Sequence, residues 1–172
     1  GTCPITAVAG RKCRELVRRR RREHPGTVIV ACGCYVQRVT DEERDELGID
    51  IILGNRLKHL LPETLASWFE GGVKKGLTLL DGRLLADTAW DALSLDRPRL
   101  RSRAFLKVQD GCSHYCSYCI VPFVRGKPVS RDLDESVEEA RRIVASGCPE
   151  IVLTGIHLGL YEKLAELVRR IG

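Results

Sequence analysis

Apolar positions in the first half of the chain alternate between helical spacing and short continuous runs. Residues 7–24 predict a helix because apolar side chains recur on one face. Continuous apolar runs predict short, buried strands of the parallel kind at residues 27–31 and 49–53. Helices with glycines after their ends are expected over residues 41–47 and 62–69. Strands that alternate with helices indicate a parallel α/β sheet.

The same alternation restarts near residue 104, after a stretch with weaker patterning. Strands are expected over residues 104–108 and 151–154, and helices over residues 134–146 and 161–171. This order is the opening of a wound α/β sheet or a β/α barrel. A complete barrel needs about 200 residues or more, so the second domain is expected to be truncated.

The pattern divides the chain into three parts. Residues 1–75 are expected to form a partial amino-terminal domain with a parallel sheet, truncated at its start. Residues 76–103 are expected to be a linker that carries a short strand or hairpin at residues 77–85. Residues 104–172 are expected to be the first units of a β/α barrel, which makes the fold class α/β.

Basic residues are clustered along the chain. Lysines and arginines number 28 against 23 aspartates and glutamates, a formal net charge of +5. A run from Arg11 to Arg22 is opposed only by Glu15, and a second run follows at residues 97–103. Such runs attract phosphate backbones, although a solvated helix face is the plain alternative for the first. No run of 18 apolar residues is present, so no membrane partner is expected.

The eight cysteines are numerous for a chain of 172 residues. Three of them lie close together with the spacing C-x3-C-x2-C, at Cys112, Cys116 and Cys119. Close cysteines suit metal ligation better than cross-linking, and metal-bound thiolates favour a reducing compartment, so a cytoplasmic location is expected. Three isolated cysteines are expected to be small core residues: Cys13, Cys32 and Cys148.

The cysteine loop follows the carboxyl end of a predicted strand, where α/β enzymes place their sites. Three thiolates can hold three irons of a [4Fe–4S] cluster and leave the fourth iron open to a substrate. One alternative is a structural zinc site with His114 or a distant cysteine as fourth ligand, which would make the chain a non-enzymatic RNA-binding module. The other alternative is three buried, free cysteines.

This loop resembles the signature of radical S-adenosylmethionine enzymes, and Tyr118 supplies the aromatic residue before the last cysteine. The longer stretch from Gly111 to Arg131, with its Cys-Ile-Val-Pro and Arg-Gly pieces, resembles the methylthiotransferase family in particular. The amino-terminal half resembles that family independently, through residues 2–6 and through the Gly-Cys-Tyr-x-Gln segment at residues 33–37. The resemblance covers nearly the whole chain.

The resemblance implies two iron–sulfur clusters. The first is a [4Fe–4S] cluster whose open iron chelates S-adenosyl-L-methionine, and its ligands would be Cys112, Cys116 and Cys119. Cys3 and Cys34 match two of the three ligands of the family's auxiliary [4Fe–4S] cluster, and the third would precede Cys3.

Three further residues are assigned to the cofactor. The resemblance implies that Tyr118 lies near the adenine of S-adenosyl-L-methionine. We also assign Gly155 and His157, which follow the strand ending at Thr154 and would face the barrel mouth. The alternative for His157 is an ordinary polar group at a strand end.

Three segments favour the branch of the family that acts on threonylcarbamoyladenosine beside the anticodon of tRNA: residues 9–14, 105–112 and 153–159. The resemblance then implies methylthio insertion at carbon 2 of that base by radical chemistry. No acid–base pair is assigned as catalytic, because the cofactors supply this chemistry. The alternative substrates are isopentenyladenosine in tRNA and an aspartate of a ribosomal protein.

The expected partners are a tRNA anticodon loop, a reductive electron donor and a sulfur donor. The base must be splayed out of the anticodon loop to reach the barrel mouth. The fragment alone is expected to be inactive. Phosphate contacts are expected from arginines of both basic runs: Arg18, Arg19, Arg21, Arg22, Arg99, Arg101 and Arg103.

Overall fold

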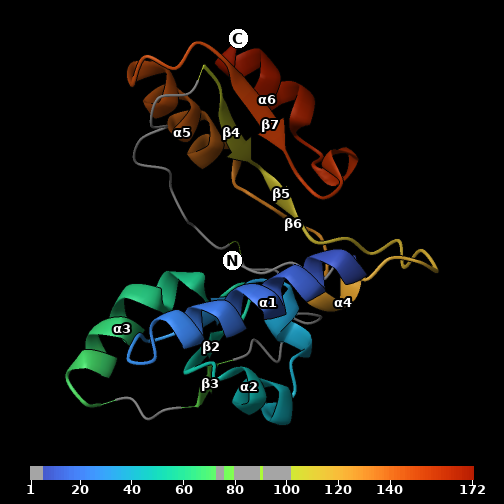
Figure 1. The fold of residues 1–172 in the computed structure, drawn as a ribbon. Helices are drawn as coiled ribbons and strands as arrows, with labels where there is room; N and C mark the ends of the chain where they lie inside the picture. The colour runs from blue at the N-terminus through green and yellow to red at the C-terminus, as the bar shows by residue number, and fades with distance from the viewer. Residues whose placement is uncertain (1–5, 73–75, 80–89, 91–101) are drawn as a thin grey trace.

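The computed structural model describes residues 6–72, 76–79, 90 and 102–172, and Figure 1 shows that they form two α/β halves. The first half begins with α1 (Ala7–Glu23), as predicted. The Thr6 hydroxyl accepts a hydrogen bond from the Ala9 amide at 3.1 Å and so satisfies one free donor of the first turn.

The first half contains a parallel sheet in the order β1 (Val30–Cys32), β2 (Ile51–Leu53) and β3 (Leu77–Leu79). All three residues of β2 are buried, as a central parallel strand requires. The connecting elements are η1 (Tyr35–Arg38), α2 (Asp41–Leu47), η2 (Lys58–Leu60) and α3 (Leu61–Phe69). The core packs one sheet face against η1 and the end of α2: Ala31, Tyr35, Val36, Leu47, Ile49 and Ile52.

The predicted strands of this half exist but are shorter than their apolar runs. Asp50 explains part of the difference, because its carboxylate accepts a hydrogen bond from the Ile29 amide at 2.8 Å, while its own amide donates to the Ile29 carbonyl at 3.0 Å. These contacts take the place of a regular ladder before β1 begins. Strand β3 lies within the predicted linker and joins the amino-terminal sheet, so this sheet extends past residue 75.

The second half contains a parallel pair, β4 (Ala104–Lys107) and β7 (Ile151–Thr154), in which Ala104 pairs with Ile151 and Lys107 with Thr154. Helices α5 (Leu133–Ala145) and α6 (Leu164–Ile171) pack together beside this pair (Figure 1). The order strand, helix, strand, helix is the one predicted. The core comprises residues from all four elements and their connections, among them Leu106, Val137, Ile143, Tyr161 and Leu167.

Three short elements of this half were not predicted. They are β5 (Gln109–Asp110), α4 (Val121–Arg125) and β6 (Val129–Ser130), and β5 pairs antiparallel with β6. Strand β7 was predicted to be buried but is half-buried along its whole length, because among the described residues it pairs with β4 alone. Helix α6 begins three residues later than predicted, after the short η3 (Leu158–Leu160) and a turn.

The predicted core cysteines separate into two classes. Cys148 is buried in the core of the second half, as predicted. Cys13 and Cys32 are only half-buried.

The two halves meet where α4 lies against η1. Arg56, which is buried, donates hydrogen bonds from one guanidinium nitrogen to the carbonyls of Arg125 and Lys127, both at 3.2 Å. These two carbonyls flank Gly126 at the end of α4. The amino-terminal half therefore binds the backbone at the end of α4, the helix that directly follows the cysteine loop.

Candidate metal and cofactor site

The cysteine loop joins β5 to α4, and Figure 1 shows it projecting away from both sheets. Its base is tightly closed. The Cys112 amide donates to the Gly126 carbonyl at 3.1 Å, and the Cys119 amide donates to the Cys116 carbonyl at 2.9 Å. Gly111 has a φ of 73°, and a Cβ there would lie 2.0 Å from the Lys127 carbonyl oxygen. Only glycine fits at this position.

Within the loop, Tyr115 has a positive φ of 48°, which is uncommon for a residue with a side chain. Its ring packs edge-on against Phe123 of α4, with the ring centroids 5.8 Å apart. This contact supports the reversal of the chain between Cys112 and Cys116.

The three cysteines differ in exposure. Cys116 is exposed, whereas Cys112 and Cys119 are half-buried. Among the described residues, the tight group of potential metal ligands is a different one: Cys112, His114 and His157, whose ligand atoms lie within 4.8 Å of one another. The three cysteines of a [4Fe–4S] cluster bind three different irons, so their sulfur atoms lie farther apart than the ligands of a single ion. The closeness of Cys112, His114 and His157 therefore does not bear on whether Cys112, Cys116 and Cys119 bind a cluster.

The donor set nevertheless fits an iron–sulfur cluster. Three thiols on one exposed loop are the ligands that such clusters take. Gly111 and the hydrogen bonds of Cys112 and Cys119 fix the backbone on both sides of the thiols. Of the two residues assigned to the auxiliary cluster, Cys34 lies within the described residues and is buried, and Cys3 lies outside them.

A charge cluster centred on a buried carboxylate lies behind the loop. The Asp110 carboxylate forms ion pairs with Lys107 at 2.8 Å and with Arg125 at 3.0 Å. It also accepts a hydrogen bond from the Gly111 amide at 2.9 Å. Burial alone raises the pKa of Asp110, but the two cations outweigh it and the pKa is lowered. Asp110 therefore stays ionised at neutral pH and holds Arg125 in place.

Arg125 connects this cluster to the other half of the protein. Burial lowers its pKa, but the Asp110 carboxylate and then the Cys34 thiol raise it further than burial lowers it. Cys34 is itself only 3% exposed. One guanidinium thus lies between the base of the cysteine loop and the buried thiol at the start of η1.

Gln109 joins the ends of the two main strands of the second half. It is completely buried; its Nε2 donates to the Gly111 carbonyl at 2.8 Å, and its Oε1 accepts from the His157 amide at 2.8 Å. A Cβ at Gly155 would lie 2.9 Å from the Gln109 Cβ, so this glycine makes room for the contact. The structure therefore brings Gly155 and His157 to the same strand edge as Cys112.

A hollow of about 440 Å³ lies between η1 and the cysteine loop. Arg38 lines it from η1, and Tyr118, Cys119 and Phe123 line it from the loop and α4. Tyr118 is 89% exposed, so its ring is available to a ligand. Gln109, Asp110 and Arg125 lie in segments that carry the family resemblance, but neither they nor Arg38 are assigned a role from the sequence. Their role in the site follows from their proximity in the fold.

The basic residues divide into structural and accessible ones. Arg21 was assigned to RNA, but its guanidinium is used within the fold. It donates hydrogen bonds to the Asp50 carboxylate at 2.5 Å and to three backbone carbonyls, those of Pro25, Thr27 and Gly48. Four of the other assigned arginines are exposed: Arg18, Arg19, Arg22 and Arg103. Three of them form ion pairs: Arg18 with Glu46 at 2.6 Å, Arg19 with Glu23 at 3.9 Å, and Arg103 with Glu150 at 3.3 Å.

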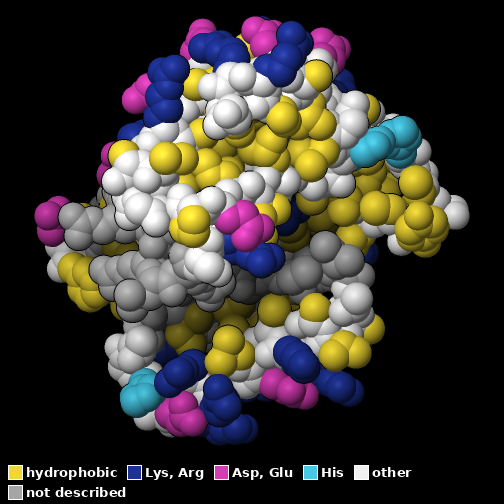
Figure 2. Space-filling model, turned by 90° about the horizontal axis from the view of Figure 1, so that it is seen from above, with side chains coloured by type: hydrophobic (Ala, Val, Ile, Leu, Met, Phe, Trp, Pro, Cys, Tyr) yellow, Lys and Arg dark blue, Asp and Glu magenta, His cyan; other side chains and the backbone are white. Residues whose placement is uncertain are grey.

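The remaining assigned arginines, Arg99 and Arg101, lie outside the described residues. Figure 2 shows that Lys and Arg side chains on one face of the molecule are mixed with Asp and Glu along opposite margins, with hydrophobic side chains between them. Of the described helices, none is both long and apolar enough to cross a membrane.

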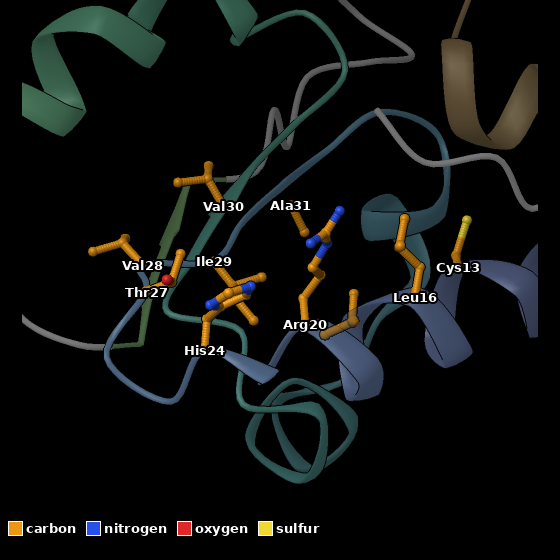
Figure 3. Close-up of a pocket in the computed structure, with 10 residues that line it drawn as sticks. Cys13, Leu16, Arg20, His24, Thr27, Val28, Ile29, Val30 and Ala31 are labelled. Atoms are coloured by element: carbon orange, nitrogen blue, oxygen red, sulfur yellow. The ribbon is translucent and has the colours of Figure 1, made fainter. Parts of the chain in front are cut away.

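A separate pocket of about 280 Å³ lies between α1 and β1 (Figure 3). Apolar side chains line most of it, including Leu16 and Ile29. Its polar or sulfur-bearing groups are Cys13, Arg20, His24 and Thr27. All of its lining residues belong to the first half, and none belongs to the cysteine loop. We assign it no chemistry.

Comparison with known proteins finds a family model that matches most of the second half. Residues 106–172 match the Radical SAM superfamily. Along 93% of its length, the chain is 33% identical to threonylcarbamoyladenosine tRNA methylthiotransferase of Bacillus subtilis, of which it covers 35%.

Two further relatives give the same picture. The Aquifex aeolicus protein of the same name is 32% identical over 98% of this chain and 42% of its own. The tRNA-2-methylthio-N(6)-dimethylallyladenosine synthase of Sphingopyxis alaskensis is 34% identical over 90% of this chain and 34% of its own. The chain thus spans well under half the length of these relatives.

Proposed function

Because this chain belongs to the radical SAM methylthiotransferase family, we propose that it is part of an enzyme that adds a methylthio group to a modified adenine of tRNA. The observation that carries the proposal is the C-x3-C-x2-C loop at the carboxyl end of a parallel strand pair, in a chain whose similarity to these enzymes runs through both halves.

The proposal gives each part of the loop a role. Cys112, Cys116 and Cys119 hold a [4Fe–4S] cluster, which supplies the radical chemistry with S-adenosyl-L-methionine when both are bound. The exposed ring of Tyr118 and the adjoining hollow offer an aromatic surface on which an adenine can stack. The start of the loop is held in one position by three residues: Gln109, Asp110 and Gly111.

The proposed substrate is threonylcarbamoyladenosine. Its support is the Asp-Gly-Cys segment at residues 110–112, the segment at residues 153–159 and the arginine-rich α1, which suits an RNA substrate better than a protein. The relatives carry two names, one for each tRNA base, so isopentenyladenosine is the competing substrate.

The test uses the protein that carries this chain, reconstituted anaerobically with iron and sulfide and incubated with tRNA, S-adenosyl-L-methionine and a reductant. Mass spectrometry of the digested tRNA should detect a methylthio group on threonylcarbamoyladenosine, and a Cys116→Ala variant should form none. Methylthiolation of isopentenyladenosine, or of a ribosomal protein, would contradict the proposed substrate. Absence of every methylthio product with a fully assembled cluster would contradict the proposed function.

A further inference from the structure

A second set of metal ligands lies at the carboxyl ends of β5 and β7. The Cys112 sulfur and one ring nitrogen each of His114 and His157 lie within 4.8 Å of one another. The two imidazole rings adjoin, with centroids 4.8 Å apart and planes tilted by 49°. A thiolate and two imidazoles are a donor set that Zn²⁺ and related divalent transition metals bind well.

The ligands come from separate segments that a buried side chain holds together. Gln109 donates to the carbonyl of Gly111, directly before Cys112, and accepts from the backbone amide of His157. Because Gln109 is completely buried, one fixed amide sets the distance between the two ligand-bearing segments. Such preorganisation lowers the cost of bringing the ligands together.

From this arrangement we infer that the cluster-free protein binds one divalent transition-metal ion through Cys112, His114 and His157. Binding releases the proton of the Cys112 thiol to solvent, because the thiolate is the ligand. Three protein ligands leave one tetrahedral position of the ion to water. Since Cys112 is also a ligand of the proposed cluster, the ion and the cluster exclude each other.

The site differs from the proposed cluster in every ligand but one, which makes the two separable. His114 and His157 would be ligands of the single ion alone, whereas Cys116 and Cys119 would be ligands of the cluster alone. Both histidines are exposed, so alanine variants should not disturb the core.

The experiment titrates the metal-free, anaerobically purified chain with Co²⁺ and follows the thiolate-to-cobalt absorption band. One equivalent should bind. The His114→Ala and His157→Ala variants should weaken binding by more than about 100-fold, because even the partners that orient a metal ligand are worth 10–100-fold. The Cys116→Ala and Cys119→Ala variants should bind Co²⁺ like the unaltered chain, and so should His24→Ala, a control at a remote histidine.

Iron reconstitution of the same variants gives the complementary pattern. The histidine variants should keep their iron, and Zn²⁺ added first should block iron uptake in the unaltered chain but not in His157→Ala. Unchanged Co²⁺ affinity in both histidine variants, or its loss in Cys116→Ala, would overturn the inference. If instead every cysteine variant keeps its iron, the proposed cluster is wrong, whatever the Co²⁺ titration gives.

Discussion

At the scale of single residues, the site depends on side chains that connect distant positions. Asp110 lies next to the cysteine loop in the sequence, but its partner Arg125 lies 15 residues further along, in a helix that was not predicted. Arg125 in turn lies beside Cys34, and Gln109 bonds to the backbone of His157. Local patterns cannot give such pairs, because they depend on how the two halves and the two strand ends meet.

Asp132 shows how one side chain can stabilise an element through its charge. It is the amino-terminal cap of α5, and its carboxylate accepts hydrogen bonds from the Asp134 amide at 2.8 Å and the Glu135 amide at 3.1 Å. The hydrogen bond from the Glu135 amide is the main cause of the lowered pKa of Asp132. A carboxyl whose pKa is lowered by folding stabilises the fold above its unfolded pKa, and this stabilisation is lost as the pH falls through the folded value.

We expect Asp132→Ala to lower the urea midpoint at pH 7, and the difference from the unaltered chain to shrink as the pH falls below about 3.9, the ordinary value for aspartate. Asp132→Asn is the control, because asparagine caps a helix but does not titrate. At pH 7 its midpoint should lie between those of Asp132→Ala and the unaltered chain, because asparagine keeps the cap and lacks the charge. A constant difference between Asp132→Ala and the unaltered chain down to pH 3 would contradict a role for the ionised carboxylate.

At the scale of elements, segments with a clear apolar pattern or end signal were predicted, and the two-residue strands were missed. Helices α1, α2 and α5 lie within one residue of their predicted bounds, because each combines an apolar face or a capping residue with a clear end signal. Strands β5 and β6 have two residues each, which is too short for any periodicity to appear. The base of the cysteine loop is made of these missed elements, so its geometry could not be predicted.

The backbone at Gly111 is the most constrained point of that base. We expect Gly111→Ala to destabilise the fold by at least about 3 kcal/mol, since a positive φ costs 1–2 kcal/mol for a residue with a side chain and the new Cβ would also collide with a backbone carbonyl. Gly147→Ala is the matched control: its φ is 84°, but nothing lies within 4 Å of the added Cβ.

Urea unfolding measures both glycine variants. Gly147→Ala should cost only about 1–2 kcal/mol, the strain of the positive φ. Equal losses in the two variants would show that the close approach to Lys127 is not a constraint of the fold.

At the scale of the whole molecule, the basic run is partly structural. Arg21 holds the loop before β1 to Asp50, whereas the other arginines of the run assigned to RNA, Arg18, Arg19 and Arg22, are exposed. The sequence pattern locates the run but does not distinguish these roles, because Asp50 lies far along the chain from Arg21. We therefore expect any tRNA contact through α1 to involve Arg18, Arg19 and Arg22 and not Arg21.

We expect the triple variant Arg18→Glu, Arg19→Glu and Arg22→Glu to bind tRNA more weakly, and the slope of log K against log salt to fall by about 2, since each lost phosphate contact removes about 0.7. Filter binding over a range of salt concentrations measures both quantities. The control carries the same charge change elsewhere: Arg141→Glu, Arg169→Glu and Arg170→Glu. If the two triple variants lose affinity and slope equally, only net charge matters and α1 is not the contact.

The most direct test of the central claim is the iron and acid-labile sulfide content of the chain after anaerobic reconstitution, in a Cys34→Ala background that leaves only the cysteine loop. The account predicts about four irons and four sulfides per chain in a brown protein. It predicts that the further change Cys116→Ala removes most of them. A colourless protein that takes up zinc instead of iron, or iron retained after Cys116→Ala, would contradict it.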